Sequence, residues 1–139
     1  MLTQIPIEDR IAIETLVTEY AWLLDHRQFD AVLGLCTDDA ELKIRGQKIH
    51  GADGLREWLD HRAASEGKRS SQHQMSLLRL EPTGADDVVR GTAALVLHVA
   101  KSGTSGSYVD LVGEYQDEYV LTDDGWRFRS RVLVTLADI

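Results

Sequence analysis

Near the N-terminus, an otherwise apolar segment ends in the sequence Thr18-Glu19-Tyr20-Ala21-Trp22-Leu23-Leu24-Asp25-His26-Arg27. Upstream of it, apolar residues recur at helical spacing, and the proline and acidic pair at residues 6–9 are typical of a first turn, so a helix is predicted to reach about residue 24. Its main apolar face consists of Ile13, Leu16, Val17, Tyr20 and Leu24. A second stripe consists of Ile11, Thr18, Trp22 and Asp25. A helix with two apolar sides is covered on both, so Asp25 is predicted to face a pocket.

Downstream of this helix, the pattern changes from helical to strand-like. Short helices are predicted at residues 28–36 and 55–64, and two short paired strands between them at residues 41–44 and 48–50. Four longer strands are predicted over residues 72–81, 88–100, 108–121 and 126–136. Helices followed by an antiparallel meander indicate an α+β fold. The length of 139 residues fits one domain that spans residues 1–139.

The composition narrows the possible partners. The formal net charge is -8, which argues against nucleic acid and against an anionic membrane surface, because both are bound through clustered Lys and Arg. The single cysteine, Cys36, excludes an intrachain disulfide. The N-terminus has neither a basic region nor a long apolar run, so we expect no signal peptide, no membrane span and a cytoplasmic location.

Several short motifs, in order, resemble those of a known superfamily. They lie at residues 20–25, 29–32, 37–41, 51–59, 72–74 and 118–128. Together they resemble the NTF2-like fold, and within it the SnoaL-like group that includes scytalone dehydratase, bile-acid dehydratase and hexachlorocyclohexane dehydrochlorinase. The resemblance covers nearly the whole chain. It implies a cone, in which a strongly curved mixed or antiparallel sheet wraps around the N-terminal helices and encloses an apolar pocket.

The resemblance also implies site residues. Dehydratase and dehydrochlorinase members use an Asp–His pair, and Asp25 and His73 stand at the matching positions. His98 falls where scytalone dehydratase has a second histidine. Tyr20 stands where the side chain varies among members and points into the pocket. Trp22 shares the stripe of Asp25. Tyr20, Trp22 and His98 are therefore candidates for substrate contact.

Arg129 is a further candidate, because family members place polar groups on the last strand. Arg127 and Arg131 lie at alternate positions beside it, and such a row is also typical of a solvated strand face. The chain departs from the family elsewhere: it has no asparagine, Leu24 replaces a tyrosine of scytalone dehydratase, and Tyr20 replaces a lysine of the dehydrochlorinase. These departures indicate a substrate other than those of the named relatives.

The Asp–His pair suggests a specific chemistry. A neutral imidazole at His73 would take a proton from carbon, and the carboxylate of Asp25 would fix its tautomer and stabilise the imidazolium. The expected function is therefore a cofactor-free lyase, with dehydratase or dehydrohalogenase-type β-elimination on a small apolar, aromatic or alicyclic ring compound. No metal is expected, since the sequence has no close His/Cys spacing of the kind that binds zinc.

Each candidate also has a structural interpretation. Asp25 could cap the next helix or pair with Arg27, and His73 could be a core histidine. Tyr20 could pack in the core with its hydroxyl satisfied, and His98 could sit in a buried strand.

Other functions remain open at this point. The same fold serves as a non-catalytic ligand-binding module and as the small subunit of ring-hydroxylating dioxygenases. A ketosteroid-isomerase-like role would need an acid pair facing one oxyanion, for which Asp110 and Asp117 are the strand candidates. By analogy with relatives, a homodimer or homotrimer is expected, with outward apolar positions such as Leu95 and Leu97 at the interface.

Overall fold

A computed structural model describes residues 4–65, 69–101 and 103–139. Its helices are α1 (Ile7–Asp25), α2 (Phe29–Val32) and α3 (Gly51–Ser65), with short 3-10 turns at Leu33–Leu35 and Leu136–Asp138. Its strands are β1 (Cys36–Ile44), β2 (Gln47–His50), β3 (Arg69–Pro82), β4 (Val88–Lys101), β5 (Tyr108–Thr122) and β6 (Gly125–Thr135).

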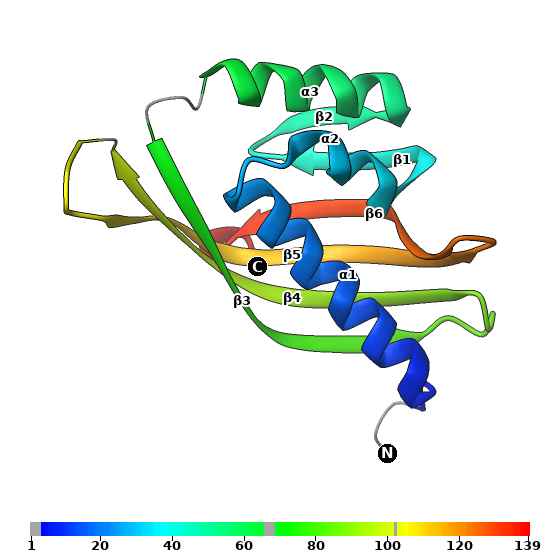
Figure 1. Ribbon diagram of the computed structural model, residues 1–139. Coiled ribbons are helices and arrows are strands. Elements are labelled where there is room, and N and C mark those ends of the chain that lie inside the picture. The colour runs from blue at the N-terminus through cyan, green and yellow to red at the C-terminus, as the bar shows by residue number, and fades with distance from the viewer. Residues whose placement is uncertain (1–3, 66–68, 102) are drawn as a thin grey trace.

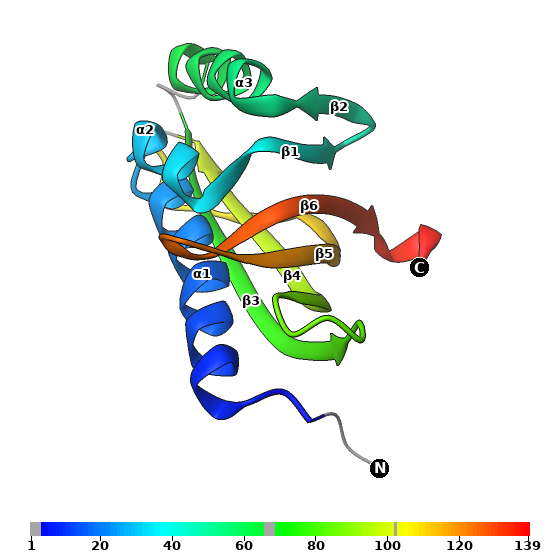
Figure 2. The same cartoon turned by 90° about the vertical axis from the view of Figure 1, so that its right-hand side faces the viewer.

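The six strands form one curved sheet in the order β2-β1-β6-β5-β4-β3. Every neighbouring pair is antiparallel except β1 and β6, which run parallel. Helix α1 lies along one face of the sheet, and α3 lies at the end formed by β1 and β2 (Figures 1 and 2). The predicted α+β fold, with a curved mixed sheet around the N-terminal helix, is confirmed.

Helix α1 begins and ends where its local chemistry permits. Pro6 precedes the first turn and its carbonyl accepts hydrogen bonds from the backbone N–H groups of Asp9 and Arg10. The acidic side chains in this turn suit the positive end of the helix dipole. The helix ends at Asp25, and Arg27 then takes a left-handed φ of 60° that turns the chain toward α2.

The inner face of the sheet packs on α1 and forms the core. In β4, alternate residues from Val89 to Val99 point inward, including Leu95 and Leu97, which are 1% and 5% exposed. The expectation that these two leucines lie at an outward interface is therefore wrong. A strand places successive side chains on opposite faces, so the outward positions are those between them, such as Val96.

Two of the bulges in the sheet affect the candidate site residues. In β3, the pairing with β4 shifts between Ser76 and Arg79, and Leu77 there adopts a φ of 51°. In β6, Phe128 pairs with Tyr119 but Ser130 pairs with Glu118, so one extra residue is inserted. A bulge moves every later side chain of its strand to the other face, relative to a regular strand.

None of the helices in the described part of the chain combines the length and the apolar character needed to cross a membrane.

Candidate active site

Asp25 and His73 form a buried pair between helix α1 and strand β3. Asp25 Oδ1 lies 2.5 Å from His73 Nδ1, and its Oδ2 accepts a 2.7 Å hydrogen bond from the backbone N–H of His73. The hydroxyl of Ser71 donates to Oδ1 at 3.0 Å. The His73 side chain is 5% exposed and that of Asp25 is 10% exposed. The prediction that this carboxylate lies within hydrogen-bond reach of a His73 ring nitrogen is confirmed.

The local fold explains why the two residues meet. Asp25 is the last residue of α1, where its side chain reaches past the helix end. Strand β3 is at the edge of the sheet, so some of its backbone N–H groups have no neighbouring strand to bind. Ser71 and His73 share the inner face of β3, two residues apart. The carboxylate therefore binds one backbone and two side-chain donors of the same strand edge.

This geometry determines the tautomer of His73. An ionised carboxylate only accepts hydrogen bonds, so the Nδ1 atom that it contacts carries the proton. In the neutral imidazole, Nε2 is then the free acceptor. Burial raises the pKa of Asp25, but the hydrogen bonds from His73 and Ser71 outweigh it and hold the pKa below its ordinary value. Asp25 is thus ionised at neutral pH and can stabilise a charged imidazole.

The pair lines a hollow of about 420 Å³ between α1 and β3. Its walls are formed by Thr18, Ala21, Trp22, Asp25, His26, Ser71, Gln72, His73 and Met75. Trp22 is 49% exposed, and its ring stacks on that of His26 with the centroids 4.0 Å apart. The structure therefore brings Trp22 together with the Asp–His pair, as the shared stripe predicts. The hollow opens to solvent past these exposed rings, in contrast to the enclosed pocket that was expected.

Tyr20 lies elsewhere, in the interior. It is fully buried, and its ring packs edge-to-face against Tyr115 and Phe128 with centroids 6.1 Å and 5.4 Å apart. Burial raises the pKa of its hydroxyl well above the ordinary range. Tyr20 belongs to the main core stripe of α1, so it does not line the hollow that contains Asp25. Among the described residues, its hydroxyl has no hydrogen-bond partner.

Two further candidates face away from the pair. His98 accepts or donates a 3.1 Å hydrogen bond with Gln74. Its neighbour Leu97 pairs directly with His73, and because strand side chains alternate, His98 lies on the opposite face of the sheet. Arg129 pairs with Glu118 through Nε, at 2.6 Å, and is 42% exposed. The substrate-contact predictions for His98 and Arg129 are therefore corrected.

Arg131, which the sequence pattern assigns to a solvated row, is instead at the centre of the core. It is fully buried and binds Asp117 through two hydrogen bonds of 2.9 Å. The hydroxyl of Tyr119 also donates to Asp117, at 2.8 Å. The guanidinium carbon lies 3.7 Å from the ring centroid of Tyr115 and 4.2 Å from that of Phe128. The bulge in β6 turns this arginine inward, and no simple sequence signal reveals that bulge.

The positive charge of Arg131 is balanced by the carboxylate of its neighbour Asp117. Burial alone would lower the pKa of Arg131, but the adjacent carboxylate of Asp117 outweighs it and raises the pKa above its ordinary value. Asp110 pairs separately with the guanidinium of Arg45. The two strand aspartates are thus each committed to an arginine, and they do not form the acid pair that a ketosteroid-isomerase-like site would need.

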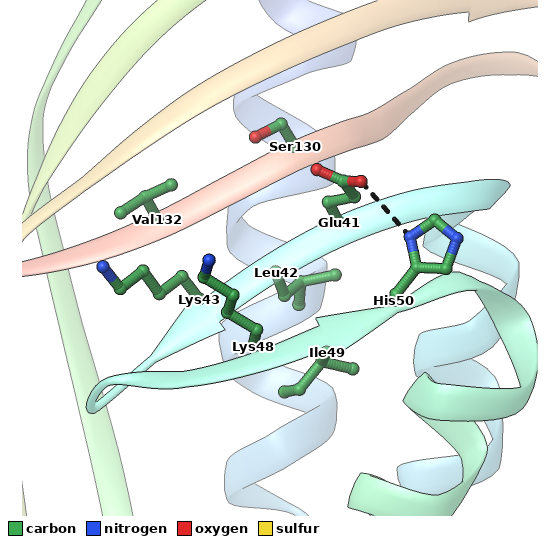
Figure 3. Close-up of a pocket in the computed structure, with 8 residues that line it drawn as sticks. All are labelled: Glu41, Leu42, Lys43, Lys48, Ile49, His50, Ser130 and Val132. Carbon is green, nitrogen blue, oxygen red and sulfur yellow. Dashed lines mark ion pairs between the residues drawn. The ribbon is translucent and has the colours of Figure 1, made fainter.

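A second hollow, of about 350 Å³, lies on the outer face of the sheet between β2, β1 and β6 (Figure 3). His50 and Glu41 form an ion pair there at 3.3 Å, and the other polar side chains are those of Lys43, Lys48 and Ser130. Both partners of the ion pair are about three-quarters exposed, at 75% and 73%. Water solvates such groups fully, so this hollow lacks the desolvated base of the Asp25–His73 site.

The described residues contain no cluster of three or more His, Cys, Asp or Glu side chains that could hold a metal ion. Cys36 is buried, and burial raises the pKa of its thiol to about 12. A thiol in this state is a poor nucleophile and a poor metal ligand.

Residues 6–132 match the SnoaL-like domain family. The chain belongs to this family. The SnoaL-like domain is also similar to solved structures. It is 26% identical to a variant of Rv3472, a protein of unknown function from Mycobacterium tuberculosis, over 96% of this chain and 81% of that one, with a TM-score of 0.82.

Two other solved structures resemble the SnoaL-like domain to a comparable degree. A candidate aromatic ring hydroxylase from Novosphingobium aromaticivorans is 26% identical, with coverage of 96% and 92% and a TM-score of 0.83. LinA, a hexachlorocyclohexane dehydrochlorinase, is 25% identical, with the same coverage and a TM-score of 0.79. The neighbours therefore include an elimination enzyme as well as a protein whose function is unknown.

Proposed function

We propose that this SnoaL-like domain is a cofactor-independent lyase that removes a proton from carbon and expels a leaving group from the adjacent carbon. The observation that carries the proposal is the buried 2.5 Å contact between Asp25 Oδ1 and His73 Nδ1. It assigns the proton to Nδ1, so Nε2 is the ring nitrogen of His73 that can act as the base. The similarity to LinA, a dehydrochlorinase, supports the same reaction class.

The reaction follows from this geometry. Nε2 of His73 takes the proton, and the electrons of the broken C–H bond form the new double bond. The leaving group departs with its bonding electrons, as halide or, after protonation by the imidazolium, as water. Asp25 stabilises the positive imidazolium while it exists. A base positioned in this way contributes about 10²–10⁴-fold in rate.

The proposed substrate is a mostly apolar, aromatic or alicyclic ring compound. Negative charge that develops on it during proton removal needs a donor. Tyr20 and Arg131 are buried in the core outside the hollow, and Arg129 and His98 face away from the Asp–His pair, so none of the four takes this role. Among the residues that line the hollow, Thr18 and Gln72 carry side-chain donors that could take it. No cofactor or metal enters the proposed mechanism.

A turnover experiment tests the proposal. Ring compounds with a hydroxyl or halide β to an acidic C–H are incubated with the protein, and products are identified by mass spectrometry. For the compound that reacts, we expect His73→Ala to lower kcat by at least about 10²-fold in protein that is still folded. Some stability is lost as well, because the buried Asp25 carboxylate loses its ring partner. His61→Ala, on the exposed side of α3, is the matched control. Retained activity in His73→Ala would sink the base assignment.

A second function is favoured by one comparison. The neighbour described as a candidate aromatic ring hydroxylase has a TM-score of 0.83 to this chain, which supports a role as the small subunit of a ring-hydroxylating dioxygenase or as a ligand-binding protein. In that case a large partner subunit or a bound ligand would purify with the protein, and His73→Ala would leave that association intact.

We also propose that the chain forms a homodimer or homotrimer through the outer face of the sheet. Val96 and Val112 pair directly across β4 and β5 on that face, and Val112 is 39% exposed. Multi-angle light scattering of the wild type and of Val112→Asp tests this proposal. We expect the substitution to shift the mass toward the monomer, and a monomeric wild type would contradict it.

A further inference from the structure

The hollow beside the Asp–His pair continues along α1. A third hollow, of about 270 Å³, lies between the first half of α1 and the bulged half of β3. Thr18 and Met75 line both this hollow and the one beside the Asp–His pair, so the two hollows are neighbours along α1 and β3. Beyond these two residues, the lining of the third hollow includes Arg10, Glu14, Leu77 and Leu78. We call the two together the α1–β3 groove.

The length of this groove follows from the helix that forms one wall. Asp25 marks one end and Glu14 lies toward the other, eleven residues earlier on the same helix. At 1.5 Å of rise per residue, the two are separated by about 16 Å along the helix axis. A single six-membered ring placed at His73 would therefore fill only the end of the groove that contains the base.

Leu77 is the unusual residue in the distal half of the groove. It is 82% exposed and holds a left-handed φ of 51°, a conformation that is strained for a leucine. The described residues leave the Leu77 side chain largely exposed, so burial of apolar surface does not offset the strain. Strained positions that packing does not explain concentrate at ligand sites. Leu77 thus offers an uncovered apolar wall beside the hollow.

The distal half is also held in place. Arg10 Nη2 donates a 3.1 Å hydrogen bond to the carbonyl of Leu78, and Arg10 Nε pairs with Glu14 at 3.1 Å. The first contact ties the β3 bulge to α1. Arg10 is therefore engaged with protein groups, and the lining between it and Trp22 is mainly apolar. This favours an aliphatic ligand over an anionic one.

We propose that the α1–β3 groove binds an aliphatic arm of the substrate. The reacting carbon lies at His73, and the arm runs along Met75 to Leu77. This inference rests on the proposed function for the identity of the reacting end, and it adds that the substrate is elongated. The substrate class is thus a ring or activated head group that carries a hydrocarbon chain, and not a compact ring alone.

Binding of two alcohols to the full chain tests the groove without any turnover. Butanol and decanol are titrated by NMR and by calorimetry, and decanol is expected to bind at least about tenfold tighter, because its additional methylenes remove more apolar surface from water. Decanol is further expected to shift the amide signals of Met75 and Leu77. Leu77→Asp should weaken decanol binding by roughly tenfold and leave butanol binding unchanged.

Leu121→Asp is the matched control. Leu121 is an exposed leucine on β5, at 47%, and lies outside the groove. Equal binding of the two alcohols, no dependence on Leu77, or the same loss in Leu121→Asp would each overturn the inference. The outcome is separate from that of the lyase proposal, because the two alcohols lack the acidic C–H that the proposed β-elimination requires, and because their binding is measured with His73 intact. Turnover that depends on His73 together with failed decanol binding would refute the elongated substrate alone.

Discussion

The carboxylate of Asp25 binds both the side chain and the backbone of His73. Oδ1 lies 2.5 Å from the ring Nδ1, and Oδ2 accepts the backbone N–H at 2.7 Å. One side chain therefore fixes the imidazole orientation and also satisfies an edge N–H of β3. Catalytic and structural consequences of changing Asp25 are linked through these two contacts.

Asp25→Asn is expected to lower both turnover and stability. The amide has one acceptor oxygen, so either the ring or the backbone N–H of His73 loses its partner, at a cost of about 1–3 kcal/mol in the free energy of unfolding. The neutral side chain also no longer stabilises the imidazolium, so kcat should fall by about 10²-fold or more. Urea unfolding and steady-state kinetics measure the two effects. Asp30→Asn, at an exposed side chain, is the control, and equal behaviour of the two variants would contradict the assignment.

The depressed pKa of Asp25 predicts a specific pH dependence of stability. The group binds fewer protons in the folded state, so its stabilising contribution is fully present above its ordinary pKa of 3.8 and is lost as the pH falls through the lower folded value. The difference in unfolding free energy between wild type and Asp25→Asn should therefore shrink below about pH 4. Chemical denaturation between about pH 2 and about pH 6 measures it. If the difference in unfolding free energy grew as the pH fell, the pKa of Asp25 would not be lowered in the folded state.

Removal of one partner of the Arg131–Asp117 pair is expected to be severe. Asp117→Ala leaves a fully buried guanidinium without its counter-charge, which costs about 3–5 kcal/mol. The double variant Asp117→Ala with Arg131→Met removes both charges and should lose less stability than Asp117→Ala and Arg131→Met do in sum. Urea denaturation of the single and double variants measures this coupling. If the double variant loses as much unfolding free energy as the two single variants do in sum, the two side chains are not coupled.

Leu77→Asn is expected to stabilise the protein. Asparagine tolerates the left-handed region better than leucine does, and the side chain is 82% exposed, so relief of strain should add about 0.5–1 kcal/mol. Leu121→Asn makes the same exchange at an exposed position in β5 and should give no gain. Thermal and chemical unfolding compare the two. A destabilised Leu77→Asn would show that the leucine side chain is held by contacts in the folded protein.

The parts of the structure that the sequence predicts are those with regular spacing. The helical stripe through Tyr20 leads directly to the core, and the resemblance pairs Asp25 with His73. Strand β4 is apolar on both faces, so its sequence does not decide which face is buried, and the expectation that Leu95 and Leu97 point outward is wrong. Strand limits are less predictable: β1 begins at Cys36, five residues before the alternating pattern of residues 41–44.

The errors arise where the spacing is interrupted. A bulge in β6 separates the outward Arg129 from the buried Arg131, although an unbroken strand would place both on one face. The left-handed Leu77 marks a second bulge that no glycine or asparagine signals. The prediction for His98 is wrong for a different reason: its position in the family resemblance does not specify the strand face on which the side chain lies. Bulges depend on pairing with the neighbouring strand, which local sequence does not encode.

The contact of Asp25 with the free edge of β3 also bears on self-association of the protein. An exposed strand edge offers unpaired N–H groups to any other strand, and at His73 this group is occupied by the carboxylate. A chain that loses Asp25 would leave this N–H group available to another strand. The residue proposed to orient the base thus also occupies a position on the strand edge at which a second copy of the chain could pair.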